Sequence, residues 1–148
     1  MKRLFFRIWI VALLLVACGG SPDPIILESS IVNETPTIGP GEFVSYPFVV
    51  DLTVMIGPFV TGVFDASLNG EATMEILVLT EPNFELWQNA TSYTAVFQSG
   101  QSIGGEFEIP INGSGTFYLI FSNRGDSTNE RMAGVIASLI YQQAISEG

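Results

Sequence analysis

The chain has 148 residues, and its 15 acidic residues outnumber its 5 basic ones, which gives a net charge of −10. Such an acidic surface repels nucleic-acid phosphates, so the composition excludes a nucleic-acid partner. The chain has no histidine, which removes the commonest general base and the commonest zinc ligand, and its single cysteine cannot form an internal disulfide.

The first 17 residues have the layout of a secretory signal. Lys2, Arg3 and Arg7 precede an apolar run from Ile8 to Ala17. This run is well short of the roughly 20 apolar residues that a membrane-spanning helix needs. A basic start, a short apolar run and small residues at its end instead indicate a signal peptide that is removed from the mature protein.

The end of this segment, Leu15-Val16-Ala17-Cys18, resembles the lipobox of bacterial lipoproteins. The resemblance implies that residues 1–17 are cleaved off and that Cys18 carries a diacylglycerol, with a further fatty acid such as palmitate on the new amino terminus. By the same resemblance, Gly19 favours the outer membrane or the cell surface. The alternative is an ordinary signal peptide with a chance cysteine. Apart from the lipid we expect no cofactor.

Residues 18–30 are predicted to be a flexible tether, because Pro22 and Pro24 favour extended backbone. Ten such residues would lift the folded part roughly 30 Å from the bilayer. Residues 31–148 then form a single domain. After residue 17 the chain keeps two basic residues against 15 acidic ones, a side-chain charge of −13. Such a surface repels anionic lipid headgroups, and we therefore expect the body of the domain to stand off the membrane.

Most of the remaining chain alternates apolar and polar residues with a period of two, as half-buried strands do. Pro47 favours an edge strand or a bulge for its segment. The wholly apolar stretch 76–79 predicts a strand covered on both faces. Only Glu81 to Asn89 favours a helical turn, and Met132 to Ile145 favours a strand over a helix. The predicted strands are 44–52, 60–68, 76–79, 107–111, 117–121 and 135–141. This pattern predicts an all-β fold, an antiparallel β-sandwich with a jelly-roll-like arrangement.

The second half carries a family resemblance. Residues 83–89 (NFELWQN) and 113–124 (GSGTFYLIFSNR), followed by a last strand that ends at Tyr141, look like the GOLD-like β-sandwiches of exported proteins. They are also similar in outline to bacterial pre-peptidase C-terminal domains. The resemblance implies a sandwich that binds or accompanies other proteins, with no catalytic residues. The loop from Gly125 to Met132 departs from the family pattern.

Phe84, Trp87 and Tyr93 cluster around the one predicted helical turn. Aromatic side chains on a loop can form a patch that binds protein or carbohydrate, and these three are our candidate binding patch. The alternative is that they cap one end of the sandwich core.

Acidic and amide side chains suggest two further sites. Asp126, Asn129 and Glu130 share a loop and could hold calcium, although the spacing matches no EF-hand. Glu106 and Glu108 lie on one strand face, about 7 Å apart, as a pair of hydrolytic carboxylates would. A solvated sheet face gives the same pattern. The integrin-type tripeptide Arg124-Gly125-Asp126 is treated as a chance match.

The sequence as a whole favours a binding or accessory module, anchored in the bacterial cell envelope outside the cytoplasm, for a protein or glycan partner. No enzymatic activity is expected. The second alternative is a structural or assembly component of an envelope complex. The third, which the sequence favours least, is a carboxylate-based hydrolase.

Overall fold

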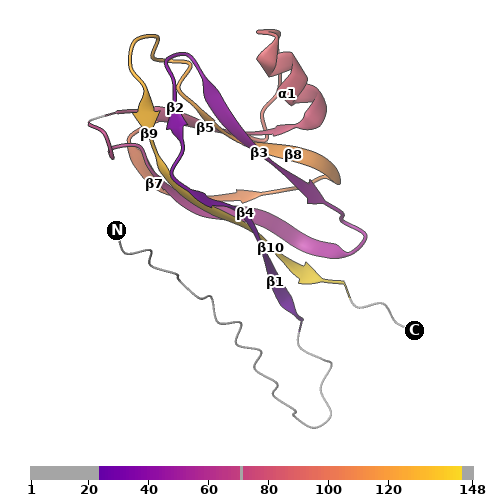
Figure 1. Cartoon of the computed structure of the whole chain (residues 1–148). Coiled ribbons are helices and arrows are strands. Elements are labelled where there is room, and N and C mark those ends of the chain that lie inside the picture. Colours follow the sequence, from indigo (N-terminus) through magenta and orange to yellow (C-terminus); the bar gives the residue numbers. More distant parts are fainter. Residues whose placement is uncertain (1–23, 71, 145–148) are drawn as a thin grey trace, which may run out of the picture.

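A computed structural model describes residues 24–70 and 72–144, and within them the chain is an all-β sandwich (Figure 1). Two four-stranded antiparallel sheets face each other. Sheet 1 contains, in spatial order, β1 (Ile26–Glu34), β10 (Gly134–Gln143), β4 (Met55–Asp65) and β7 (Gly104–Pro110). Sheet 2 contains β3 (Phe43–Val50), β8 (Gly115–Ser122), β5 (Met74–Thr80) and β6 (Phe97–Ser102).

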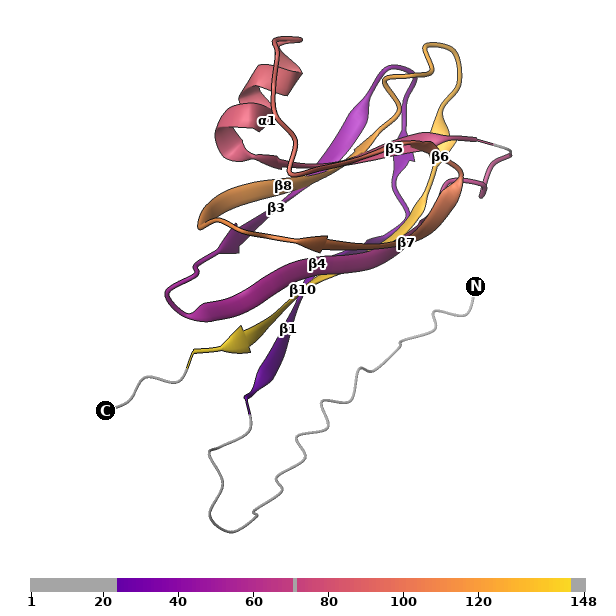
Figure 2. The ribbon, with the colours of Figure 1, turned by 180° about the vertical axis from the view of Figure 1, so that it is seen from behind.

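The strand order is that of a jelly roll, as the sequence predicted. Successive strands alternate between the two sheets, and only β5 and β6 follow one another within a sheet. That connection carries α1 (Glu81–Gln88), the one helix in the part of the chain that the structure describes. A short ribbon, β2 (Thr37–Ile38) paired with β9 (Arg131–Met132), bridges the sheets at one end. Figure 2 shows α1 on the outer side of sheet 2.

The main core lies between the sheets and is built by alternation. In β4, Val60 and Phe64 point inward and are buried, whereas Val63 is exposed. In β8, Phe117, Leu119 and Phe121 do the same from the opposite sheet. The period-two apolar pattern of these strands therefore has its expected cause, which is burial of one face.

Pro47 lies in β3, the edge strand of sheet 2, as predicted. Next to it Tyr46 donates a hydrogen bond from its hydroxyl to Oε1 of Glu34 at 2.5 Å, which joins the edge of sheet 2 to the edge of sheet 1. Burial, and then this hydrogen bond, raise the pKa of Tyr46 well above its usual value. The predicted C-terminal strand is confirmed as β10.

The boundary between tether and domain differs from the sequence prediction. Ile26 to Ser30 belong to β1 and pair with β10, so the sheet begins five residues before the predicted start of the domain at residue 31. The polar residues Glu28, Ser29 and Ser30 concealed this strand. An edge strand has one neighbour and much exposed surface, and it therefore tolerates polar side chains.

Gly62 allows the neighbouring strands β10 and β7 of sheet 1 to approach β4 closely. A Cβ atom there would lie 2.4 Å from the carbonyl oxygen of Ile136 and 2.6 Å from the ring of Phe107. Neither the backbone carbonyl nor a buried ring can move far. We expect Gly62→Ala to destabilise the domain by about 1–3 kcal/mol, measured by urea denaturation.

The matched control for this prediction is Gly134→Ala in the neighbouring strand. There a Cβ atom would meet only Cδ1 of Leu68, at an ordinary 3.5 Å. Equal denaturation midpoints for the two variants would contradict the assigned close approach at Gly62.

Candidate functional site

The predicted aromatic patch is not exposed, which corrects the sequence interpretation. Phe84 and Trp87 are only 8% and 6% exposed, and they form a second core with Leu77, Leu79 and Ile120. Tyr93 is partly buried against the same cluster. The all-apolar stretch 76–79 of β5 needs a cover on the outer side of sheet 2, and the inner face of α1 supplies it.

This second core is tightly organised. The rings of Phe84 and Tyr118 stack with centroids 4.1 Å apart, and Phe43 meets Trp87 edge-on at 4.7 Å. The guanidinium of Arg124 lies 3.9 Å from the Trp87 ring centroid and donates a hydrogen bond to the Trp87 carbonyl at 3.0 Å. Arg124 therefore holds the loop after β8 against α1.

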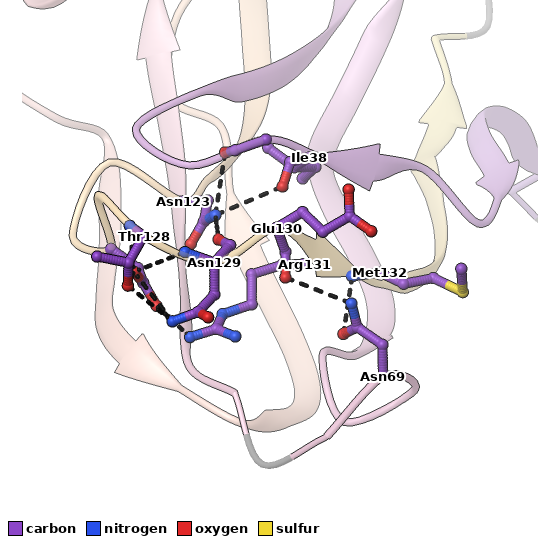
Figure 3. A network of polar contacts seen from close by, with 10 residues as sticks. Ile38, Asn69, Asn123, Thr128, Asn129, Glu130, Arg131 and Met132 are labelled. Carbon is purple, nitrogen blue, oxygen red and sulfur yellow. Dashed lines mark hydrogen bonds and ion pairs between the residues drawn. The ribbon is translucent and has the colours of Figure 1, made fainter.

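The loop after β8 is organised around the carboxylate of Asp126. Its partners Thr128, Asn129 and Arg131 are labelled in Figure 3. The Asp126 carboxylate accepts hydrogen bonds from the backbone N–H and the hydroxyl of Thr128, both at 2.8 Å, and from Asn129. It also forms an ion pair with Arg131. Donation by Thr128, and then by Asn129, holds the pKa of Asp126 well below its usual range.

This arrangement does not favour calcium at Asp126. The oxygens of its carboxylate receive N–H and O–H donors and face a guanidinium, which repels a cation. Glu130 is exposed and its carbonyl accepts from Asn69 at 3.3 Å. Within residues 24–70 and 72–144, no three acidic side chains gather as a metal site would require.

Asn123 fixes the same end of the sandwich from inside. It is 1% exposed, and its side-chain amide lies within hydrogen-bonding distance of the carbonyls of Ile38, Gly39 and Asn129, at 3.4, 3.0 and 2.7 Å (Figure 3). Asn123 therefore ties β8, β2 and the 123–131 loop together.

Beside this end, the outer face of sheet 1 has a shallow hollow that the sequence did not predict. We call it the distal groove. It has a volume of about 570 Å³, and Asn33, Val63, Asp65, Leu68 and Ile136 are among the residues that line it. The side chains of Val63, Leu68 and Ile136 are 42–51% exposed. An aliphatic floor of this kind is suited to receive an apolar side chain.

Strand register and one loop position the distal groove. Ile136 of β10 lies opposite Val63 of β4 on one side and Asn33 of β1 on the other. Leu68 lies in the loop after β4. The neighbouring Asn69 fixes this loop, because its side-chain oxygen accepts a hydrogen bond from the Met132 N–H at 3.1 Å (Figure 3). The groove is therefore built on strands and on a loop with a fixed attachment.

The rim of the distal groove is acidic. Asp65 lines it, and Glu106 lies opposite Val63 in β7. The Ser67 hydroxyl, and then the Ser67 N–H, lower the pKa of Asp65 by hydrogen bonding. Both arginines of the described ranges lie elsewhere, on Trp87 and on Asp126. The distal groove is therefore an aliphatic surface edged by negative charge.

The predicted carboxylate pair borders the same face. Glu106 and Glu108 are both exposed in the edge strand β7, and their cross-strand neighbours are Val63 and Thr61. They lie side by side on an open sheet face, as expected of a solvated strand, and do not point toward one another across a cleft.

The lipobox Leu15-Val16-Ala17 and Cys18 lie outside the described residues, so the anchor remains a prediction. Searching the described part of the chain for a helix long and apolar enough to cross a membrane finds none.

No protein-family model and no curated protein matches this chain. Among solved structures it is similar to a protein described under "Bacillus endospore appendages form a novel family of disulfide-linked pili". That match has 12% identity, 89% coverage of this chain, 100% of that chain and a TM-score of 0.48. A Yersinia pseudotuberculosis-derived mitogen also matches, at 12% identity, 84% and 90% coverage and a TM-score of 0.39. So does a chain of the infectious bursal disease virus Gt strain, at 13% identity, 93% and 36% coverage and a TM-score of 0.38.

The lowered pKa of Asp126 gives a pH-dependent contribution to stability. An acid whose folded pKa lies below its unfolded value of about 3.9 stabilises the fold above that value, and the contribution is lost as the pH falls below it. We expect the difference in urea midpoint between the wild type and Asp126→Asn to be constant from about pH 7 to 5 and to shrink below about pH 4.

Glu130→Gln is the control for this prediction, because it removes an exposed carboxylate of the same loop. A difference between wild type and Asp126→Asn that stays constant down to about pH 2 would contradict the assigned hydrogen bonding.

Proposed function

We propose that this protein is a lipid-anchored binding module of the bacterial cell envelope, located outside the cytoplasm and without catalytic activity of its own. In this proposal it presents the distal groove to a protein partner. The observation that carries the proposal is an aliphatic floor with an acidic rim on the uncovered face of sheet 1, whereas α1 covers much of the outer face of sheet 2.

The composition supports a role in binding over one in catalysis. The chain has no histidine, and after residue 17 it has no lysine and no thiol except that of Cys18, which the lipid would occupy. Schiff-base chemistry needs the lysine and thiolate chemistry needs the thiol, and histidine is the commonest general base. The carboxylates beside the distal groove are exposed on an open sheet face.

The chemistry of the distal groove favours a protein with an apolar side chain flanked by Lys or Arg. The acidic rim complements basic groups, and a side-chain charge of −13 after residue 17 disfavours a second copy of this chain by repulsion. A glycan is less well matched, because the floor is aliphatic and the predicted aromatic platform of Phe84 and Trp87 is buried.

Substitution of Ile136 tests the binding site. A carboxylate at the centre of the floor would be desolvated by the partner, so we expect Ile136→Glu to weaken binding about tenfold or more. The measurement is pull-down from detergent-solubilised membranes, with the captured protein identified by mass spectrometry and its affinity then determined with purified components.

Leu86→Glu is the matched control. Leu86 is also an exposed aliphatic residue, 40% exposed, but it lies on α1 over the opposite sheet. Equal loss of partner in both variants would contradict the distal groove as the binding site. Co-purification in a fixed ratio, unaffected by Ile136→Glu, would instead favour the assembly component that the sequence left open.

Substitution of Cys18 tests the anchor. Thioether formation needs the thiol, so we expect full-length Cys18→Ser to incorporate no radiolabelled palmitate in cells and to keep residues 1–17, since lipoprotein processing follows lipidation. Gel autoradiography and intact mass measure both outcomes. Ser21→Ala, three residues away, should be labelled normally. Label on Cys18→Ser would show that the anchor is assigned to the wrong residue.

A further inference from the structure

At the end opposite the distal groove, the molecule exposes a second group of aliphatic side chains, which we call the proximal tip. Its members come from the start of β1 and from the turn between β3 and β4. They are Ile25 (57% exposed), Ile26 (67%), Leu52 (42%), Val54 (49%) and Ile56 (52%). Chain turns ordinarily carry polar residues, so two aliphatic side chains at the top of one turn are unusual.

Hydrogen bonds show that these segments lie side by side. The N–H of Gln143 donates to the carbonyl of Ile25, and the N–H of Ala144 donates to the carbonyl of Val54, both at 3.0 Å. Gln142 lies between Ile26 and Ile56 in the register of sheet 1. The end of β10 therefore joins the two halves of the proximal tip into one surface (Figure 1).

The turn is built so that its aliphatic side chains project. Oδ1 of Asp51 accepts from the N–H and the hydroxyl of Thr53 at 2.9 and 2.6 Å, so the one charge of the turn is directed back into it. The N–H of Leu52 donates to the hydroxyl of Ser114 at 3.0 Å. Leu52 and Val54 are thus held in place by polar groups while their own side chains face solvent.

We propose that the proximal tip rests in the lipid interface of the membrane that holds the anchor. The inference builds on the proposed lipid at Cys18, and for this end of the domain it replaces the expectation that the body stands off the membrane. Six residues lie between Cys18 and Ile25, and even a fully extended chain spans at most about 25 Å from one to the other. The anchor therefore keeps this end, and no other end of the domain, beside the bilayer.

Apolar contact would hold the proximal tip there, with no contribution from lipid charge. Its one charged turn residue is Asp51, and Glu28 lies further along β1; both are acidic. Aliphatic residues at an interface reach about 5–10 Å into the boundary between headgroups and acyl chains. Contact should therefore be at least as strong on uncharged phosphatidylcholine as on anionic lipid.

The test uses the full lipidated protein reconstituted in phosphatidylcholine vesicles. An environment-sensitive dye is attached to Leu52→Cys or, as a second site, to Val54→Cys. In both cases we expect a blue shift of the dye and quenching by nitroxide-labelled lipid. The matched control is Ile103→Cys, an aliphatic residue that is 52% exposed and lies between β6 and β7 at the far end. Its dye should be quenched by iodide in the water and not by the lipid.

The outcomes separate this inference from the anchor. Intact mass first establishes whether the reconstituted protein carries the diacylglycerol, and its absence would overturn the proposed anchor itself. With the lipid present, dyes at positions 52 and 54 that respond like the dye at position 103 would overturn the membrane contact alone. If the dyes at positions 52 and 54 become protected from iodide as protein density rises, without quenching by nitroxide-labelled lipid, the proximal tip contacts a second copy of the chain. That result would also overturn the membrane contact.

Discussion

The position of β10 between β1 and β4 is the constraint on which the rest of this structure depends. The strand pairs along most of its length with the first strand of the domain and with a strand some seventy residues earlier in the chain. Because β1 and β10 are antiparallel, the start of the domain lies beside its end, which makes one end of the sandwich proximal to any N-terminal anchor. The distal groove lies at the opposite end, where the loop after β4 meets the end of β1 and the start of β10. Sheet 1 also cannot be complete until β10 is available, so its closure depends on contacts that are distant in sequence.

The outer faces of the two sheets differ in what covers them. α1 packs on the outer face of sheet 2, whereas the outer face of sheet 1 carries no helix in the described part of the chain. In β5 both phases are apolar, so Leu77 and Leu79 need a cover, and α1 supplies it with Phe84 and Trp87. In β4 and β10 the outward phase is mixed: Thr61 and Ser138 separate the aliphatic residues at the two ends. The middle of this face is polar enough to remain in water without a covering helix. Its two ends are apolar, so burying them against another surface would be favourable.

Much of the fold could be predicted from the sequence, and the failures have physical causes. Period-two alternation marks strands whose burial is one-sided, as in Val60–Phe64 and Phe107–Ile111, and the prediction of strands there was correct. The polar start of β1 gave no such signal, because an edge strand is specified by its partner and not by its own pattern. The burial of Trp87 could have been predicted. A strand that is apolar on both faces, as 76–79 is, needs a packing partner on each side, and the adjacent predicted helix was the candidate for the second side.

The distal groove could not have been predicted, because Ile136, Val63 and Leu68 meet only through the register of strands distant in sequence.

Under the proposed function, the two ends of sheet 1 together determine the height and direction from which a partner reaches the distal groove. β4 runs through the sheet between these ends, and its 11 residues at about 3.3 Å each separate them by roughly 35 Å. If the proximal tip is held at the bilayer, the strands rise away from it and the distal groove faces sideways at about that height. The acidic surface supports the same orientation, because an exposed face bearing Glu28, Glu106 and Glu108 is repelled by anionic lipid. Apolar contact at one end and charge repulsion along the face would then act together to keep the distal groove accessible from the side.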